Sequence, residues 1–192
     1  MLALPPAAPA APRRQVFVGT ALACAAAASL LGGMLALWLR FRDQAIATDG
    51  RWVPKGVAIP GVPSNVMLLT FIPICVCAQW AVYSAKRDDK PHTGLALGLV
   101  GVLGLMVINA QAYIYSQMRL PANGGAYPAM FYTLTGALVA LLIVGVVFSA
   151  MTAFRFLGGR TADREVVSAH ALYWYFLSVG YTMLWFVVYV TK

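Results

Sequence analysis

Side chains that could hold a metal ion or act as nucleophiles are few in this chain. The three cysteines, Cys24, Cys75 and Cys77, all lie in long apolar stretches, where a secreted-type disulfide framework does not form. Cys75 and Cys77 are two residues apart, which places them on nearly opposite faces of a helix and prevents both from binding one ion. The two histidines, His92 and His170, are isolated from each other. We therefore expect packing cysteines, hydrogen-bonded or interfacial histidines, and neither a metal site nor heme ligands on this chain.

Uncharged polar side chains, in contrast, gather in three of the apolar stretches. In hydrocarbon such groups need hydrogen-bond partners, and bonds between helices supply them at about 0.6–2 kcal/mol each. We expect these side chains to join the third, fourth and fifth helices to one another or to another subunit. Asn109 and Gln111 point in different directions on a helix, so at least one of them is expected to face outward. The residues concerned are Asn109, Gln111, Tyr113, Tyr115, Tyr132, Thr133, Thr135, Tyr173, Tyr175 and Ser178.

Five long stretches without a charged residue position these side chains. A bilayer core of about 30 Å needs about 20 apolar helical residues to cross it, and each stretch exceeds that length. Mid-membrane Asp, Glu, Lys and Arg mark ion pathways and proton relays, and the five stretches contain none of them. The sequence therefore predicts an all-α fold, an integral membrane bundle of five transmembrane helices. The uncharged stretches are 15–39, 56–85, 91–118, 120–154 and 166–191, and the expected spans within them are approximately 15–39, 64–85, 92–116, 128–154 and 166–190.

The rest of the chain is too short for a soluble domain. With 192 residues, 61% hydrophobic and 10% charged, we expect one membrane domain over residues 15–192, preceded by a disordered Pro/Ala-rich tail over residues 1–14. The first apolar run is longer than a signal-peptide core, so we read it as a retained span. The net charge of +8 comes from basic residues at span ends, where they meet lipid phosphates, so no nucleic-acid partner is expected.

The distribution of basic residues predicts the orientation. With five spans, the N-terminal tail shares a side of the membrane with the second and fourth loops, and this side carries eight of the 14 basic residues. The positive-inside rule then predicts a cytoplasmic N-terminus. Trp52, in the expected loop from residue 40 to residue 63, suits a position beside the lipid headgroups.

Small residues predict close helix contacts. Gly94, Gly98, Gly101 and Gly104 give the third span a flank that lets neighbouring backbones approach. The same role is expected of Gly136, together with Ala140, in the fourth span. A kink is expected in the second span at Pro73, since proline removes a helical hydrogen bond.

Three local patterns, in order, resemble those of one known family. They are Gln111-Ala-Tyr113-Ile-Tyr115 at the end of the third span, Phe131-Tyr-Thr-Leu-Thr-Gly136 early in the fourth, and Ala171-Leu-Tyr173-Trp174-Tyr175-Phe176 in the fifth. With the spacing of the five spans, they resemble the subunit III family of heme-copper terminal oxidases in its shorter five-helix form. The resemblance covers the chain from about residue 56 to its end.

The chain departs from the family pattern at every buried protonatable position. The family's third-span Glu corresponds to Ile114, and its two histidines after the Thr-Gly pair correspond to Leu138 and Leu141. In the last helix, its His, Asp and an earlier Glu correspond to Tyr175, Ser178 and Ser168, and no Glu stands near residues 25–27. The resemblance therefore implies the family's scaffold and partners without a proton-active site.

What the resemblance implies is an accessory, non-catalytic subunit of a cytochrome c oxidase-type complex in the plasma membrane of a bacterium. Such a subunit binds phospholipid and stabilises the catalytic subunit, and it packs with subunits I and II, which carry the heme and copper. We expect no cofactor on this chain. Two alternatives stay open: an accessory or assembly protein of a nitric oxide reductase, and a small membrane transporter. The predicted contact residues for neighbouring helices, partners or lipid are Asn109, Gln111, Tyr113, Tyr115, Thr133, Thr135, Gly136, His170, Tyr173, Trp174, Tyr175 and Ser178.

Overall fold

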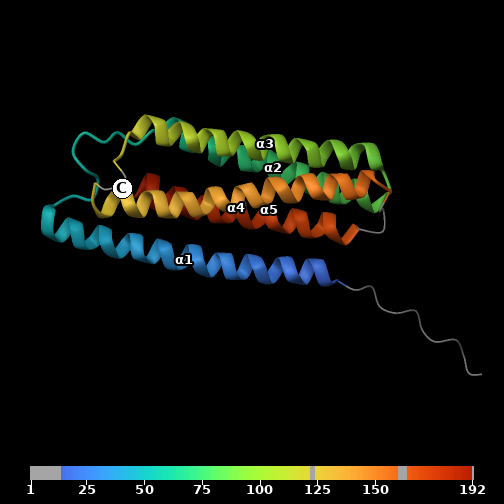
Figure 1. Cartoon of the computed structure of the whole chain (residues 1–192), viewed down its shortest axis with the longest axis horizontal. Helices are drawn as coiled ribbons and strands as arrows, with labels where there is room; N and C mark the ends of the chain where they lie inside the picture. The colour runs from blue at the N-terminus through green and yellow to red at the C-terminus, as the bar shows by residue number, and fades with distance from the viewer. Residues whose placement is uncertain (1–13, 122–123, 160–163, 192) are drawn as a thin grey trace, which may run out of the picture.

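The computed structural model describes residues 14–121, 124–159 and 164–191 and confirms the predicted fold class (Figure 1). Over these residues, five helices are long and apolar enough to cross a membrane, and no strand is present. The helices are α1 (Gln15–Asp49), α2 (Gly61–Lys86), α3 (Lys90–Met118), α4 (Ala126–Leu157) and α5 (Arg164–Leu184), and α5 continues into a π-helix, η1 (Trp185–Val190). The expected tail over residues 1–14 lies, apart from Arg14, outside the described residues.

Helix α1 is longer than the first expected span. The charged residues after Leu39 predict a loop, but the helix continues to Asp49 and spans 35 residues. No glycine or proline interrupts residues 40–49, so nothing in the sequence stops the helix at the edge of its apolar run. It ends at Gly50, which adopts a left-handed conformation (φ 69°) and donates its N–H to the Ile46 carbonyl oxygen at 3.0 Å.

Glycine, proline and aspartate residues determine where the next helices begin. Helix α3 is capped by Asp89, whose side chain accepts a hydrogen bond from the backbone N–H of His92 at 3.3 Å, and Pro91 occupies the first turn. Helix α4 follows Gly125, whose φ of 107° is accessible to glycine but strained for other residues. Pro73 lies inside α2, as the sequence requires.

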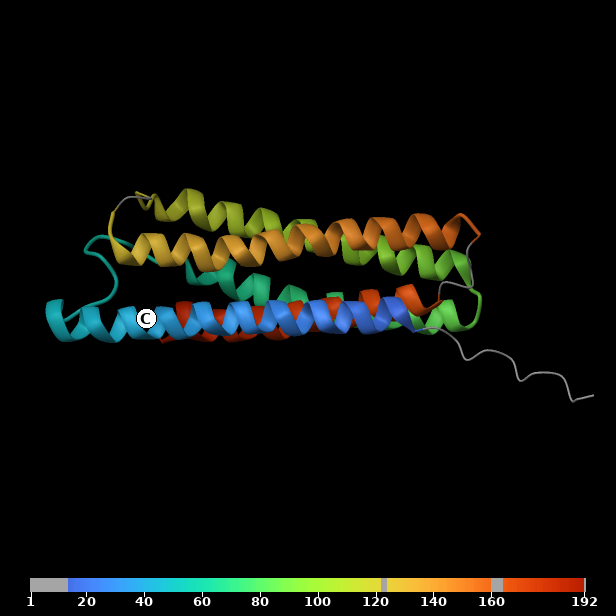
Figure 2. The same ribbon diagram turned by 60° about the horizontal axis from the view of Figure 1, so that its bottom comes forward.

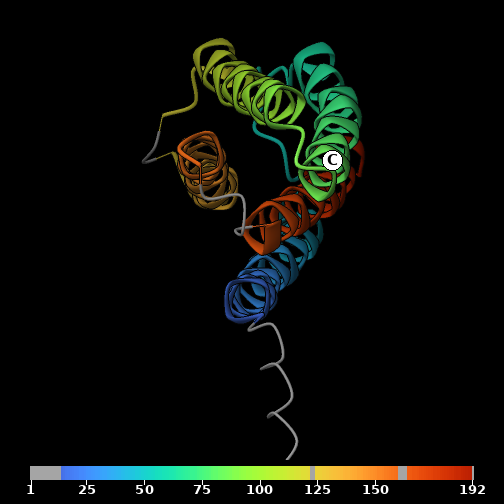
Figure 3. The same ribbon diagram turned by 90° about the vertical axis from the view of Figure 1, so that its right-hand side faces the viewer.

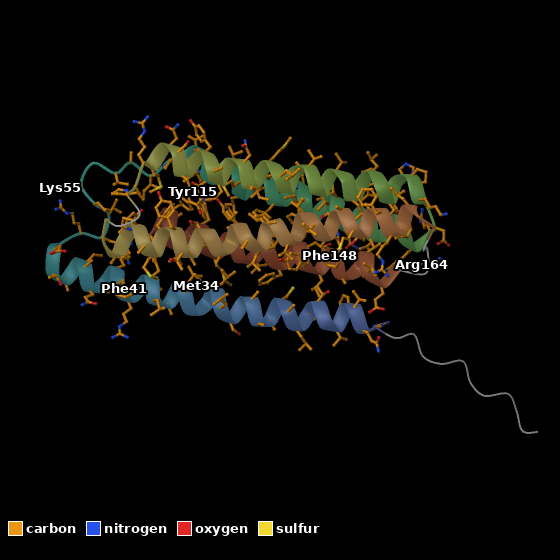
Figure 4. All side chains as sticks on the ribbon, viewed as in Figure 1. Met34, Phe41, Lys55, Tyr115, Phe148 and Arg164 are labelled. Atoms are coloured by element: carbon orange, nitrogen blue, oxygen red, sulfur yellow. The ribbon has the colours of Figure 1, made fainter. Side chains whose placement is uncertain are left out.

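The helices run side by side along one axis (Figure 2). Helix α5 packs against α1, α2 and α4, while α3 packs between α2 and α4. Seen along the bundle, α1 lies at its edge beside α5, on the far side from α2 and α3 (Figure 3). Lys55 and Arg164 lie at opposite ends of the bundle, which separates two charged ends from an apolar middle (Figure 4).

The glycines of α3 and α4 do not all serve the same purpose. An added Cβ at Gly104 would lie 2.6 Å from the Trp174 ring, so the missing side chain leaves room for the tryptophan of α5 to pack against α3. Gly98 and Gly136, by contrast, face open space within the chain. That Gly136 lets a neighbouring backbone approach therefore stays a prediction. Gly145, further along α4, does meet a neighbouring helix, since an added Cβ there would lie 3.2 Å from the Trp174 ring.

Candidate functional site

Hydrogen bonds between α3 and α4 form the first part of a buried polar site. The Tyr115 hydroxyl donates to Thr135 Oγ1 at 2.8 Å, and the Thr135 hydroxyl donates to the Phe131 carbonyl oxygen at 2.6 Å. Figure 4 shows Tyr115 between the two helices. The Tyr132 hydroxyl donates to the Leu120 carbonyl oxygen, 3.0 Å away, just beyond the end of α3. Both tyrosines thus tie α4 to the last turn of α3 or the residues after it.

A second group joins α4 to α5 around the fully buried side chain of His170. Trp174 Nε1 donates toward Ser149 Oγ at 3.1 Å and toward His170 Nε2 at 3.0 Å. The Ser149 hydroxyl lies 2.7 Å from His170 Nε2 and 3.0 Å from the Gly145 carbonyl oxygen. Each tautomer of the imidazole therefore finds a partner at Nε2: a protonated Nε2 donates to Ser149, and a bare Nε2 accepts from Trp174.

Helix α5 is also bonded to α2, a helix that sequence reasoning left out of the polar site. The Tyr175 hydroxyl donates to Gln79 Oε1 at 2.7 Å, and Trp185 Nε1 donates to Asn65 Oδ1 at 2.9 Å. The Tyr181 hydroxyl donates to a backbone carbonyl of α2, that of Ser64, at 2.8 Å. Asn65 and Gln79 are uncharged polar residues in the second apolar stretch. The criterion that selected the polar residues of the third, fourth and fifth stretches would therefore have found them as well.

Gln111 is an amide buried inside the site. Its side chain is fully buried and faces the Tyr115 and Tyr189 hydroxyls without a hydrogen bond of good geometry to either. Tyr189 is carried there by the π-helix η1. Near this end of the bundle, aromatic rings tie α1 to α4: Trp38 lies 5.2 Å from Trp52 and 5.5 Å from Tyr127 between ring centroids.

Trp52, which follows the end of α1, is buried in the protein. It is 6% exposed and packs edge-on against two other rings, so its indole is enclosed by protein side chains. Its expected depth beside the lipid headgroups stays a prediction. The contact with Trp38 is possible because α1 extends beyond its apolar run and turns the chain back toward α4.

The structure divides the other predicted contact residues between inside and outside. Tyr173 donates its hydroxyl to the Leu141 carbonyl oxygen at 2.8 Å, which adds a bond between α5 and α4. Ser178 lies against Cys75 of α2. Asn109, Tyr113 and Thr133 are exposed, and Gly136 faces open space. Of the pair Asn109 and Gln111, the first points outward and the second inward.

The interior of this site is neutral. Ile114 and Leu138, two positions where the resemblance implies a protonatable residue in the family, are fully buried among apolar side chains. Over the described part of the chain, no three His, Cys, Asp or Glu side chains come together as a set of metal ligands. What the arrangement does chemically is to cross-link helices by hydrogen bonds at lipid depth, where such bonds are worth about 0.6–1.7 kcal/mol each.

A group of charged contacts lies at the end of the bundle near Arg164. Arg164 donates to Asp88 at 2.5 Å, which joins the start of α5 to the turn between α2 and α3. Hydrogen bonds from His92 lower the pKa of the Asp89 carboxyl group. Glu165 Oε1 accepts the backbone N–H of Phe17 at 2.9 Å, so an acidic side chain of α5 satisfies the first turn of α1.

Comparison with known proteins assigns this arrangement to a family. The sequence profile described as Cytochrome c oxidase subunit III matches residues 33–192. The chain belongs to the cytochrome c oxidase subunit III family. The resemblance inferred from the sequence is thus confirmed, and the match begins inside α1, earlier than the three local patterns indicated.

Curated relatives carry the same family name. The chain is 28% identical over 157 residues to the "Probable cytochrome c oxidase subunit 3" of Rickettsia bellii, covering 76% of this chain and 54% of that protein. It is 26% identical over 148 residues to cytochrome c oxidase subunit 3 of Sus scrofa (73% and 55%) and 24% identical over 163 residues to that of Rattus norvegicus (79% and 61%). The chain spans little more than half the length of the subunit III relatives it matches.

Proposed function

We propose that this subunit III family member is an accessory, non-catalytic component of a respiratory terminal oxidase. In this role it stabilises the catalytic subunit and the lipid around it, while subunits I and II hold the heme and copper and reduce oxygen. The observation that carries the proposal is the family match over residues 33–192, which includes the whole polar site. The neutral, cross-linked interior supports it, because such a bundle is a rigid wall against which a larger subunit can pack.

The location proposed for the chain is the bacterial plasma membrane, with the N-terminus in the cytoplasm. The five helices make it a multi-pass membrane protein. Its basic residues favour the end near Arg164, because Arg164 bonds to Asp88 in the short turn that also holds Lys86, Arg87 and Lys90. The positive-inside rule places that end in the cytoplasm. A reporter enzyme active only in the cytoplasm, fused after residue 192, is expected to be inactive; activity there would reverse the orientation.

Co-purification tests the proposed function. The full chain, tagged at one terminus and expressed in its own cells, is extracted in a mild detergent and recovered by the tag. We expect the recovered material to show heme absorbance and to contain two larger membrane subunits, while the tagged chain separated from them by a harsher detergent shows no heme. Recovery of the chain without any heme protein, over a range of mild detergents, would overturn the proposal.

A further inference from the structure

The outer face of α3 carries an amide group at lipid depth. The helix has 29 residues and is about 43 Å long, so it exceeds a hydrocarbon core of about 30 Å. Asn109 lies about 13 Å along the axis from the last residue, Met118. When the helix projects equally beyond both surfaces of the hydrocarbon core, about 7 Å of it lies outside at each end. Asn109 is then about 7 Å below the nearer surface of the hydrocarbon.

The Asn109 amide is both exposed and without a hydrogen bond to any other described residue. Exposed hydroxyl groups elsewhere avoid this problem by bonding to their own helix. The Thr182 hydroxyl, for example, donates to the Ser178 carbonyl oxygen at 2.8 Å, and Thr133 bonds to its own helix in the same way at 2.7 Å. Acyl chains offer neither a donor nor an acceptor, so a protein group from outside the chain that bonds the Asn109 amide would be favoured.

Asn109 belongs to a continuous stripe along α3. Tyr113 and Gln117 follow it at intervals of one helical turn, both exposed, and both line a groove of about 410 Å³ with residues 58 and 60–63. On the other side of Asn109, small and aliphatic side chains continue the same face, and Gly98 has open space where a Cβ would stand. We call this surface the α3 stripe. It consists of Gly98, Val102, Leu105, Asn109, Tyr113 and Gln117.

We propose that the α3 stripe docks against a membrane-spanning helix of the catalytic partner, which presents a hydrogen-bonding side chain at the depth of Asn109. The inference rests on the proposed function for the identity of that partner. A glycine without a neighbour lets a second helix approach closely, and an amide then supplies the bond that fixes its depth and rotation. The groove beside Tyr113 and Gln117 receives the end of the same helix.

The first experiment weakens the bond without changing the fold. Asn109→Leu replaces an exposed side chain of similar size, so the subunit itself is expected to fold normally. Loss of one interhelical hydrogen bond is expected to lower retention of the heme-bearing subunit by about 3-fold to 20-fold as detergent is increased. Thr182→Val removes an exposed polar group that bonds only to its own helix, and its retention is expected to equal that of the wild type. Wild-type retention in Asn109→Leu would overturn the proposal.

The second experiment maps the contact in the assembled complex. A photoreactive p-benzoylphenylalanine replaces Leu105 on the α3 stripe or, as the matched control, Val144 on α4; both positions are about half exposed. We expect a cross-link to the heme-bearing subunit from position 105 and none from position 144. A cross-link from position 144 alone, or from position 105 only to lipid or to a second copy of this chain, would refute docking through α3. Failure of the wild type to recover heme would instead refute the proposed function.

Discussion

Replacing Gly104 with alanine tests the contact that brings α3 and α5 together. The added Cβ would lie 2.6 Å from Cη2 of Trp174 and 3.0 Å from Cγ2 of Val146, both well inside van der Waals contact. The Trp174 ring is not free to swing aside, because its Nε1–H donates toward Ser149 and His170. Relief of the clash therefore requires either separation of the helices or loss of a buried hydrogen bond.

The cost follows from two opposing terms. Overpacking of a well-filled core costs about 1–3 kcal/mol. Exchange of glycine for alanine in a helix returns about 1 kcal/mol. Gly98→Ala on the same helix is the matched control. Its added Cβ meets no atom within 4 Å, so this variant has the gain in helix propensity without the cost of overpacking. Gly104→Ala is therefore expected to be less stable than Gly98→Ala by about 1–3 kcal/mol.

Unfolding of the two variants by SDS in mixed micelles, followed by circular dichroism, measures this difference. The comparison needs no assumption about helix propensity in a membrane, because both variants make the same exchange in α3. The near-ultraviolet signal sums the five tryptophans and nine tyrosines of the chain, and it is expected to change in Gly104→Ala only, because Trp174 is the tryptophan that the added Cβ meets. Equal unfolding midpoints for the two variants would show that the two helices are not in contact at Gly104.

Two further outcomes are expected. Tyr115→Phe removes the 2.8 Å bond to Thr135 and should lower the stability of the isolated subunit by about 0.6–1.7 kcal/mol in the same assay. The control variant Tyr113→Phe, on an exposed face of the same helix, should leave the stability unchanged. Equal effects of the two variants would contradict the inward position of Tyr115. Because His92 lowers the Asp89 pKa below its ordinary 3.8, the capping interaction stabilises α3 above that pH and is lost as the pH falls through the folded-state pKa. Hydrogen exchange in the first turn of α3 should therefore be faster in Asp89→Asn than in the wild type at pH 6, and equal in the two at strongly acidic pH. A difference that persists in acid would assign the effect to another group.

The number of helices was predictable because charge is excluded from hydrocarbon, so uncharged stretches and helices coincide. The end of α1 was not, because a helix stops where its backbone is interrupted. Gly50 provides that interruption, ten residues after Arg40, the first charged residue that follows the apolar run. The burial of Trp52 follows from the continuation of α1 beyond its apolar run, and it too could not be predicted from the sequence.

Partners across helices were the least predictable part of the site. A contact of Tyr175 with a neighbouring helix was expected, but its acceptor Gln79 is 96 residues away, and only the packing of α5 on α2 brings them together. Gly98 and Gly104 look alike in sequence, yet one faces open space and the other a tryptophan ring. A helix with apolar residues on all sides does not reveal which side is covered.

In the π-helix at the end of α5, each backbone hydrogen bond spans one more residue than in the regular helix before it. In a regular helix each residue advances by about 100° around the axis, so removal of a single residue between Trp185 and Val190 would rotate everything beyond the deletion by that angle. Tyr189 would then leave Gln111 and turn toward the acyl chains. The inward orientation of Tyr189 thus depends on one extra residue in the backbone of η1 rather than on the identity of any side chain.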